Sequence, residues 1–592
     1  MSHRWPILIS FCLGVAISFL RFGSAILHPD SVLLGGWDHP DSLSNHWLLV
    51  WISTQMAAGE SILHNDLYYV PVGDKPWLAG NGSVGFWMAP FLWVLGWPTG
   101  VPIGFSVLWG GIAMAFYWLC QGFQIRRWAA LFPISLVLCM PYLGHELSAG
   151  RFSQVDILWL CLSWAGLMHL FQKNNLPVAI LTGVCVSLTA VMYWYYAWFF
   201  VLIALWVALS MGVLKQITPW SGIAIAAGVS VLCISPIAVL FAHNWAAIPG
   251  TQELIFPSPE AVQSGMEIFP MTFLGPGLGG QSVLCWIGCG LAVVLGFREG
   301  RSPLTLSLIG IAFIFGLLSM GTNTPMFEMV YGLATPLKRF WWPARHVLVF
   351  GLAVSLLAAH GVRAFMVHNQ LWGKNIVMVS LALLVPFTHM AQGQSLETVT
   401  TPLSGVPMPY AELDFLPEGG VIHLPLSPEI SVSQAPLYFQ LYHQRPMLNG
   451  HAQWVDRVRP ELWDAQIDGH VFLSDLQSYE HNPLQNRIRF NADELEYLKT
   501  LNLRYIVLDP SLFSKPLAPM LRGLREGLTV LFGSPVHRHQ SVLIWDTHNW
   551  TKRSEVSLST WEWPSTLIKG NGSQPIRGPK AFNPYLKVEK HK

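Results

Sequence analysis

Carboxylates gather in one polar stretch that follows the first apolar segment of the chain. This stretch, 35–82, begins GGWDHPDSLSNHWLLVW and holds five Asp or Glu residues against the single base Lys75. A carboxylate beside a buried site can take the proton of a hydroxyl that attacks an activated carbon, which is the role of a general base. Asp38 and Asp41 are the candidates for this chemistry. Alternatively, Asp41 is the N-cap of a helix that begins near Leu43, because its side chain can accept a backbone N–H.

A second polar segment, GHELSAGRFSQVDI, carries His145, Glu146, Arg151 and Asp156. Arg151 is its only Lys or Arg, and it can pair with Glu146 or Asp156. Arg151 can instead hold an anionic group, for which guanidinium geometry is well suited. A further alternative is an oxygen-rich site made by Asp38, Glu146 and His145, which would hold a divalent cation such as Mg or Mn.

The third candidate segment is LKRFWWPARHVLVF, at the entrance to a long apolar run. Lys338, Arg339 and Arg345 flank two tryptophans in it. A base at a helix start opposes the helix dipole, whereas an anion at that place is favoured. These bases can therefore clamp a lipid-linked phosphate and stabilise it as a leaving group. In the alternative interpretation they snorkel and grip phospholipid headgroups.

The composition is that of a membrane protein with a polar tail. Hydrophobic residues make up 52% of the chain and charged residues 11%, against about 25% charged in soluble domains. Residues 1–390 hold 15 Lys or Arg and 13 Asp or Glu, whereas the shorter 391–592 holds 19 and 20. A net charge of +1 argues against a broad electrostatic partner such as nucleic acid.

Eleven apolar runs approach the roughly 20 residues that a membrane-spanning helix needs. They are 5–22, 101–121, 128–143, 155–171, 176–192, 195–213, 220–241, 282–297, 304–319, 345–365 and 375–390. The continuous block 176–213 is too long for one helix, and we split it near Tyr193–Tyr196, where aromatic residues suit a membrane interface. We interpret the first run as an uncleaved signal-anchor helix.

The orientation depends on the run 84–98, VGFWMAPFLWVLGWP. If this run lies in the interface, one side of the membrane collects nine bases and the single acid Glu299. The positive-inside rule favours this arrangement. The N-terminus is then cytoplasmic and the tail extracytoplasmic, as expected of a protein in a bacterial inner membrane.

The tail alternates strand-like and helix-like segments. GVIHLPL and RYIVLDP read as buried strands, and the amphipathic run NADELEYLKTLNL precedes the second. PLAPMLRGLREGLTVLF followed by SVLIWDT repeats that order. The pattern predicts an α/β domain, and it contains no Gly-rich phosphate loop, metal cluster or nucleophile motif.

Four short motifs resemble those of the GT-C superfamily of polytopic membrane glycosyltransferases. They are WDHPDS and HNDLYYVPVGD in the first loop, GRFSQ, and RFWWPAR. The resemblance covers 1–390 and implies an α-helical GT-C-like transmembrane domain there, with a catalytic first outer loop at 23–100. It is compatible with a soluble extracytoplasmic α/β domain at 391–592. The tail lacks the WWDYG motif of the oligosaccharyltransferases, which argues against an asparagine-linked transferase.

The resemblance implies an inverting transfer of a sugar from a polyprenyl-phosphate-linked donor to a glycan, lipid or protein acceptor. Asp41 would be the general base, with Asp38 supporting it or binding a cation. The bases that would neutralise the lipid phosphate are Arg345, Lys338, Arg339 and Arg151. The rings that would stack on the sugar are Trp37, Trp47 and Trp51.

Two other functions stay open. A non-catalytic membrane scaffold of the same fold needs none of these residues for chemistry. A lipid or polysaccharide transporter would be expected to show ionisable residues inside helices or an inverted repeat. Nearly every charge of 1–390 falls in a predicted loop, and no internal repeat is visible.

Overall fold

The chain folds into two compact units in a computed structural model. The helical unit comprises Met1–Gly36 and Ala79–Thr401, and the mixed unit comprises Trp37–Leu78 and Pro402–Lys592. The structure describes residues 4–36, 40–62, 67–71, 73, 83–125, 127–213, 219–246, 282–298, 303–321, 324–332, 342–368, 374–391, 396, 398–402, 410, 413–426, 435–449, 461–481, 487–513, 518–539 and 541–558.

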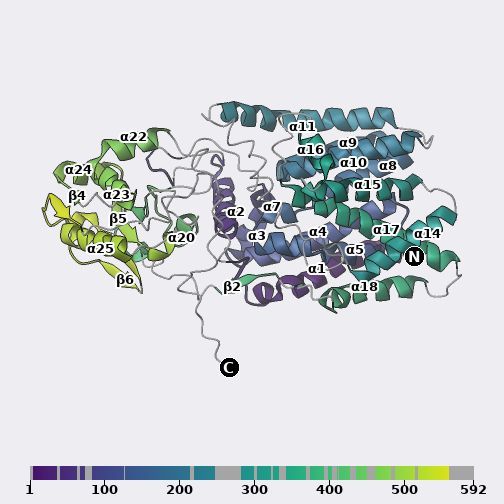
Figure 1. Cartoon of the computed structure of the whole chain (residues 1–592), viewed down its shortest axis with the longest axis horizontal. Coiled ribbons are helices and arrows are strands. Elements are labelled where there is room, and N and C mark those ends of the chain that lie inside the picture. The colour runs from purple at the N-terminus through teal and green to yellow at the C-terminus, as the bar shows by residue number, and fades with distance from the viewer. Residues whose placement is uncertain are drawn as a thin grey trace, which may run out of the picture. The chain divides into compact units, whose positions relative to one another are not determined.

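The helical unit consists of helices that run side by side (Figure 1). They are α1 (Arg4–Leu27), α3 (Val84–Leu95), α4 (Gly100–Gly122), η1 (Arg127–Ala130), α5 (Leu131–Leu138), α6 (Pro141–Ser148), α7 (Phe152–Val155), α8 (Leu158–Gln172), α9 (Leu176–Met192), α10 (Trp194–Val213), α11 (Trp220–Ala246), α14 (Val283–Arg298), α15 (Pro303–Ser319), α16 (Pro325–Gly332), η4 (Pro343–His346), α17 (Val347–His368) and α18 (Lys374–Ala391).

Each of the eleven predicted runs overlaps a helix, but the count of eleven spans is not confirmed. Among the described residues, six helices are long and apolar enough to cross a membrane, or seven if the bent pair Arg127–Leu138 and Pro141–Ser148 is one span. Apolar helices such as α9 and α15, of 17 residues each, reach about 26 Å against the roughly 30 Å hydrocarbon core. The chain is an integral membrane protein.

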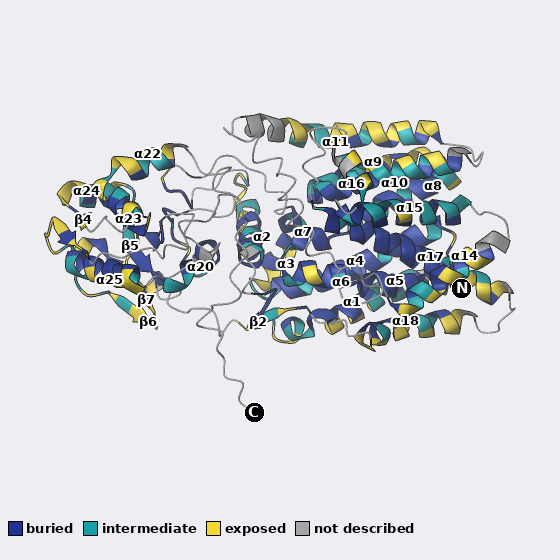
Figure 2. Ribbon diagram, in the orientation of Figure 1, coloured by how far each residue is buried: buried dark blue, intermediate teal, exposed yellow. Residues whose placement is uncertain are grey.

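Burial separates central helices from outer ones. In the segment Pro343–Val367, which contains α17, 83% of the 18-residue apolar stretch is buried. The buried share is 72% in α4 and 17% in α11. Figure 2 shows α4, α5 and α17 mostly buried and α11 largely exposed. Val231 and Leu232 of α11 are 67% and 72% exposed, and an exposed apolar face of this kind suits lipid contact.

Several charges lie inside helices, among them Arg21 of α1, Glu146 of α6 and Arg363 of α17, against the expectation that nearly every charge of 1–390 falls in a loop. Arg21 of α1 is 1% exposed. Its guanidinium donates to the Leu138 carbonyl at 3.1 and 3.0 Å, to Met140 at 2.7 Å and to Leu396 at 3.3 Å. Leu138 ends α5, where helix carbonyls lack intrahelical partners. Gly144 packs so closely that a Cβ there would lie 2.3 Å from Arg21 Nη1.

The two segments at which the chain leaves the helical unit, near Gly36 and Val399, are hydrogen-bonded to the end of α6. Strand β1 (Val32–Leu34) pairs with β2 (Thr400–Pro402). Just beyond β1, the Gly36 N–H donates to the Ser148 carbonyl at 2.8 Å. Just before β2, the Val399 N–H donates to Ser148 Oγ at 2.9 Å. The start of the acid-bearing loop and the start of the tail are therefore anchored at the same residue.

The mixed unit is built on a four-stranded sheet of order β3-β5-β7-β6 and a two-stranded sheet. Its elements include β3 (Gly420–Leu424), α20 (Ala435–His443), α22 (Glu461–Gly469), α23 (Val471–His481), β4 (Arg487–Arg489), α24 (Ala492–Thr500), β5 (Leu503–Leu508), α25 (Ala518–Phe532), β6 (His537–His539), β7 (Val542–Asp546) and β8 (Glu555–Ser557). β3 runs parallel to β5, and β7 runs antiparallel to β5. The strands and helices predicted in the tail are present at these positions.

Burial also sets the ionisation of groups in this unit. His423 of β3 is fully buried, and neither ring nitrogen has a hydrogen-bond partner within the described part of the chain. Burial lowers the pKa of His423 to about 3 and lowers the pKa of His443 well below its ordinary value. Both rings are therefore neutral core groups at pH 7.

The first loop departs from the predicted domain boundary at 390/391. Within the predicted loop 23–100, helix α2 (Pro40–Ala58) packs against α20 of the tail, and Trp47 lies in the core of the mixed unit. The helix also begins earlier than expected, at Pro40, so Asp41 lies in its first turn and is not the N-cap of a helix that starts near Leu43. An acid in a first turn interacts favourably with the helix dipole.

Replacement of Arg21 by Met should lower the melting temperature of the full chain in detergent. The Leu138, Met140 and Leu396 carbonyls would lose a buried partner, and each unsatisfied group costs about 1–3 kcal/mol. Arg21→Lys should recover part of the loss, because an ammonium donates but lacks the guanidinium fork. Arg127→Met, at an exposed base, is the control. Equal melting temperatures for the Arg21→Met and Arg127→Met proteins would contradict the role assigned to Arg21.

Candidate functional site

A polar cluster lies where several helices of the helical unit break. The first break follows α6, where Gly150 adopts φ 69°. The Arg151 N–H donates to the Glu146 carbonyl at 2.8 Å and the Gly150 N–H to Leu147 at 3.0 Å, which is a Schellman motif that favours glycine at this position. The turn brings Arg151 back to the helix, and its Nη1 lies 3.2 Å from Glu146 Oε2. Of the two predicted partners of Arg151, Glu146 is the one with which it forms an ion pair.

Gln154 of α7 joins this ion pair to a second arginine. With its side-chain amide turned so that both ends are satisfied, Gln154 donates to Glu146 Oε2 at 2.9 Å and accepts from Arg345 Nη2 at 3.3 Å. Its backbone carbonyl accepts a hydrogen bond from the Tyr196 hydroxyl. Glu146 is 2% exposed and Gln154 3%, so the connection lies inside the protein.

Arg345 lies in the short turn η4 that leads into α17, and aromatic rings hold its guanidinium. The Cζ atom lies 4.5 Å from the ring centroid of Tyr195, 5.5 Å from that of Tyr193 and 5.6 Å from that of Trp342. Contacts of this kind stabilise a guanidinium without neutralising its charge. Within the described part of the chain, Arg345 forms no ion pair with a carboxylate.

The break between α9 and α10 supplies the tyrosines of the cluster. Tyr193 separates the two helices and stacks on Tyr195, with ring centroids 5.4 Å apart. The predicted split of 176–213 is therefore confirmed. The hydroxyls of Tyr193 and Tyr142 are buried and form no hydrogen bond with another residue that the structure describes. Tyr142 also lies within electrostatic range of Glu146, Arg345 and Arg151.

The composition of this cluster suits an anion. Arg151 is ion-paired with Glu146, and the Gln154 amide links that carboxylate to the guanidinium of Arg345. Buried hydroxyls without a partner are rare in folded proteins, and two of them lie beside the guanidiniums as potential donors. Guanidiniums and hydroxyls are the groups that bind phosphate oxygens most strongly. We name Arg345, Arg151, Glu146, Gln154, Tyr142, Tyr193 and Tyr195 the arginine cluster.

Other predicted site residues are placed differently. Trp47 and Trp51 are 5% and 8% exposed in the core of the mixed unit. Their rings stack on each other at 5.8 Å, and Trp47 also packs on Tyr68 at 5.5 Å. The structure gives both rings a packing role, and sugar binding by them stays a prediction. Trp37, the third predicted ring, lies outside the described residues.

The predicted acids and bases lie in different parts of the chain. Asp41 belongs to the mixed unit, whereas Arg345 and Arg151 belong to the helical unit. Asp38, Lys338 and Arg339 lie outside the described residues. The expectation that the first-loop acids and the phosphate-binding bases face one cavity therefore stays a prediction.

The two described members of the predicted cation site point to different sides of α6. His145 is exposed and Glu146 is buried, and the Glu146 carboxylate already accepts from Arg151 and Gln154. Among the described residues, no three His, Cys, Asp or Glu side chains form a group that could hold a metal ion. The described donors do not fit a divalent cation, and the contribution of Asp38 stays a prediction.

The sequence predicts no site role for the tyrosines, because the run Tyr193–Tyr196 indicates only a division between two helices. The signal that could have found them is an aromatic run, YWYY, at a helix break in the same chain as an arginine preceded by tryptophans.

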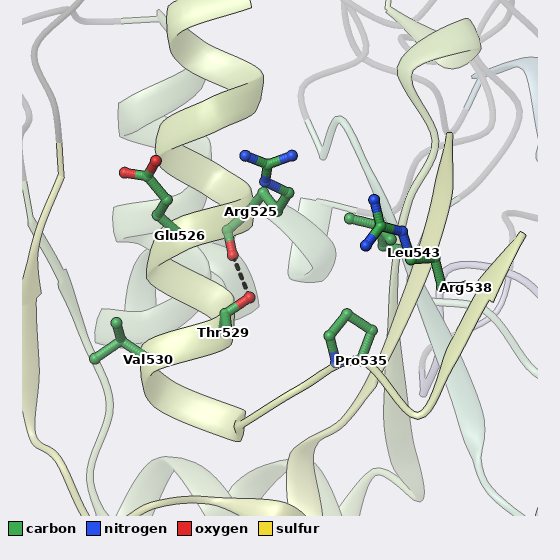
Figure 3. Close-up of a pocket in the computed structure, with 7 residues that line it drawn as sticks. All are labelled: Arg525, Glu526, Thr529, Val530, Pro535, Arg538 and Leu543. Atoms are coloured by element: carbon green, nitrogen blue, oxygen red, sulfur yellow. Dashed lines mark hydrogen bonds between the residues drawn. The ribbon is translucent and has the colours of Figure 1, made fainter. Parts of the chain in front are cut away.

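A pocket of about 380 Å³ lies in the mixed unit between α25 and the strands β6 and β7 (Figure 3). Thr529 Oγ1 in its wall donates to the Arg525 carbonyl at 2.7 Å. Arg525 and Arg538 line it from the helix and from the strand, and both are exposed. Exposed charges are screened by water and salt, and no predicted site residue lines this pocket. The arginine cluster is the stronger candidate.

No family model matches the chain, and no curated protein matches it. Solved structures similar to it include the following two. The oligosaccharyltransferase of Archaeoglobus fulgidus, in complex with zinc and sulfate, has a TM-score of 0.49 at 13% identity, over 86% of this chain and 68% of that one. ArnT from Cupriavidus metallidurans, bound to undecaprenyl phosphate, has a TM-score of 0.38 at 11% identity, over 92% of this chain and 98% of that one. Because both TM-scores lie below 0.5, we argue the function from the residues of this chain.

Proposed function

We propose that the chain is a membrane glycosyltransferase that moves a sugar from a polyprenyl-phosphate-linked donor to a glycan, lipid or protein acceptor. The observation that carries the proposal is the arginine cluster. Arg345 is held by rings and an amide, without a carboxylate of its own among the described residues. A charge kept in this way is available to an anion.

The surroundings of the cluster favour an anion with an apolar tail. Arg345 and Tyr195 lie at the first turns of apolar helices, in segments long enough to cross a membrane. A soluble phosphate would have to leave water to reach such a place, whereas the phosphate of a membrane lipid already lies at the interface. Positive groups aimed at a departing phosphate stabilise the charge that develops on it.

In the proposed reaction, an acceptor hydroxyl attacks the anomeric carbon of the donor sugar. The bond from that carbon to the phosphate oxygen breaks, and the polyprenyl phosphate leaves with the electron pair. Asp41 takes the hydroxyl proton. Attack on the face opposite the leaving group inverts the anomeric centre.

The role of Asp41 is assigned from the resemblance of the first-loop motif WDHPDS and stays a prediction. The proposal assigns leaving-group stabilisation to the helical unit and proton removal to the mixed unit.

The buried Arg21 bears on the alternative of a transporter, for which ionisable residues inside helices are expected. Its guanidinium is fully engaged with backbone carbonyls at a helix break. It therefore holds the fold and is not free to bind a transported group. A non-catalytic scaffold with the same fold and a transporter both stay open as alternatives.

We further propose that the N-terminus is cytoplasmic, the mixed unit extracytoplasmic and the membrane the bacterial inner membrane. Arg363 donates a hydrogen bond to the Gln124 carbonyl, so two segments assigned to the inner face lie together. A cysteine placed at Gln124 should react with an impermeant reagent from the cytoplasmic side. Labelling from the outer side alone would reverse the orientation.

Transfer kinetics with a polyprenyl-phosphate-linked sugar test the two assigned roles. Arg345→Lys keeps the charge but loses the planar fork and the ring contacts. It should raise the KM for the donor about tenfold, because roughly 1–2 kcal/mol of charge-assisted hydrogen bonding is lost. Arg487→Lys, at an exposed arginine of the mixed unit, should leave the KM unchanged. An unchanged donor KM in the Arg345→Lys protein would contradict the proposal that Arg345 binds the donor phosphate.

Asp41→Asn should lower kcat about 10²–10⁴-fold, the usual contribution of a general base. Melting and expression should change little, because the amide keeps the shape of the carboxylate. Asp38→Asn should have a milder effect if Asp38 only supports Asp41 or binds a cation. Loss confined to Asp38→Asn would exchange the two roles. Full activity in the variant that combines Asp38→Asn and Asp41→Asn would contradict a catalytic role for both acids and favour the scaffold alternative.

A further inference from the structure

Helix α2, which carries Asp41, is built into the core of the C-terminal domain. Trp47, Trp51 and Ile52 of this helix share one core cluster with residues of the tail. A continuous line of rings leads from Trp47 to Tyr68, Tyr69 and Trp463, with successive centroids 5.5, 5.4 and 5.8 Å apart. Contacts of this density fix a helix in position and orientation.

A single buried amide joins the three segments that meet there. Gln440 of α20 is 2% exposed. Its Oε1 accepts from Trp47 Nε1 at 2.9 Å, and its Nε2 donates to the carbonyls of Leu67 and Arg445 at 2.7 and 2.9 Å. Because indole N–H can only donate and carbonyls can only accept, this orientation of the amide is the one that satisfies all three contacts.

Residues 67–70 of the acid-bearing stretch are paired with the tail through backbone hydrogen bonds. The Met447 N–H donates to the Leu67 carbonyl at 2.8 Å, and the Val70 N–H donates to the Met447 carbonyl at 3.1 Å. The Tyr69 N–H donates to the Asn449 carbonyl at 3.2 Å. Within this stretch, α2 and residues 67–70 are therefore both attached to the tail.

We infer that the C-terminal domain is the element that positions the first-loop acid, and that Gln440 is a positioning residue for Asp41. Asp41 precedes Trp47 by six residues on one helix, which is about 9 Å along its axis. Release of the indole from Gln440 would let the start of α2 shift, and a general base must lie within hydrogen-bond reach of its proton. The assignment to Asp41 rests on the proposed function, whereas the attachment of α2 to the tail does not.

Hydrogen exchange on the full chain tests the attachment. Gln440→Leu has similar volume and removes three hydrogen bonds. Exchange of the α2 amides and of residues 67–70 should become about tenfold faster or more, since buried partners are left unsatisfied. Asp475→Leu is the matched control: it removes three hydrogen bonds from Arg489 to a buried side chain of the same unit. Its effect should be confined to α23 and β4.

Transfer kinetics on the same proteins test the positioning role. Gln440→Leu should lower kcat while the donor KM stays unchanged, and Asp475→Leu should keep both values. Trp47→Phe keeps a ring but loses the indole N–H, so it should lower kcat to a smaller degree and leave the donor KM unchanged. This variant replaces Gln440→Leu in the test if Gln440→Leu does not fold. The attachment is overturned if the α2 amides exchange at the same rate in the Gln440→Leu and wild-type proteins. It is also overturned if they exchange at the same rate in the Gln440→Leu and Asp475→Leu proteins.

The two proposals fail separately. Absence of transfer activity in the wild-type protein would remove the proposed function but leave the exchange experiment to decide the attachment. Selective loosening of α2 together with an unchanged kcat would keep the attachment and remove Gln440 as a positioning residue for catalysis.

Discussion

Helices that break inside an apolar bundle leave backbone groups that water cannot reach, and those groups must find partners in the protein. This constraint shapes the helical unit. Arg21 satisfies the carbonyls between α5 and α6, and Ser83 Oγ donates at 3.0 Å to Met192 at the end of α9. Tyr195 accepts from the Trp342 N–H at the entrance of η4 at 3.2 Å. The arginine cluster lies among these breaks, because irregular backbone is where side chains from several helices converge.

Among the described residues, the arginine cluster holds two guanidiniums and one carboxylate. Arg21 is neutralised in effect by carbonyl dipoles, whereas Arg345 faces the π electrons of tyrosine and tryptophan rings. A guanidinium over rings keeps most of its ability to attract an anion. Glu146 is shared between Arg151 and the Gln154 amide. The arrangement is stable without a ligand and still favours one.

Local features of the sequence predicted the local structure well. Apolar runs marked the helices, Tyr193–Tyr196 marked the break between α9 and α10, and the strands at β3, β5 and β7 followed from short β-branched segments. The Arg151–Glu146 pair was also within reach of sequence reasoning, because five residues and a glycine turn connect the two. Arg345 could be singled out as a base at a helix start.

Contacts between distant segments had no such signal. Arg21 bonds to a carbonyl 375 residues away, and Trp47 bonds to Gln440, 393 residues away. Composition therefore suggested a domain boundary at 390/391, although α2 packs with the tail. The apolar rings of Trp47 and Trp51 suited a sugar face as well as a core, and only the fold distinguishes these. Among the described residues six helices, or seven with the bent pair, are long and apolar enough to span, so the count of eleven stays a prediction.

The most direct measurement is an experimental structure of the full chain with a polyprenyl phosphate bound. A phosphate oxygen should lie about 3 Å from the Arg345 guanidinium, with the Tyr193 or Tyr142 hydroxyl turned toward the same group. The polyprenyl chain should run along the apolar helices of the helical unit. A phosphate bound away from Arg345, with the guanidinium still held only by its rings and Gln154, would contradict the assignment of the arginine cluster as the donor site.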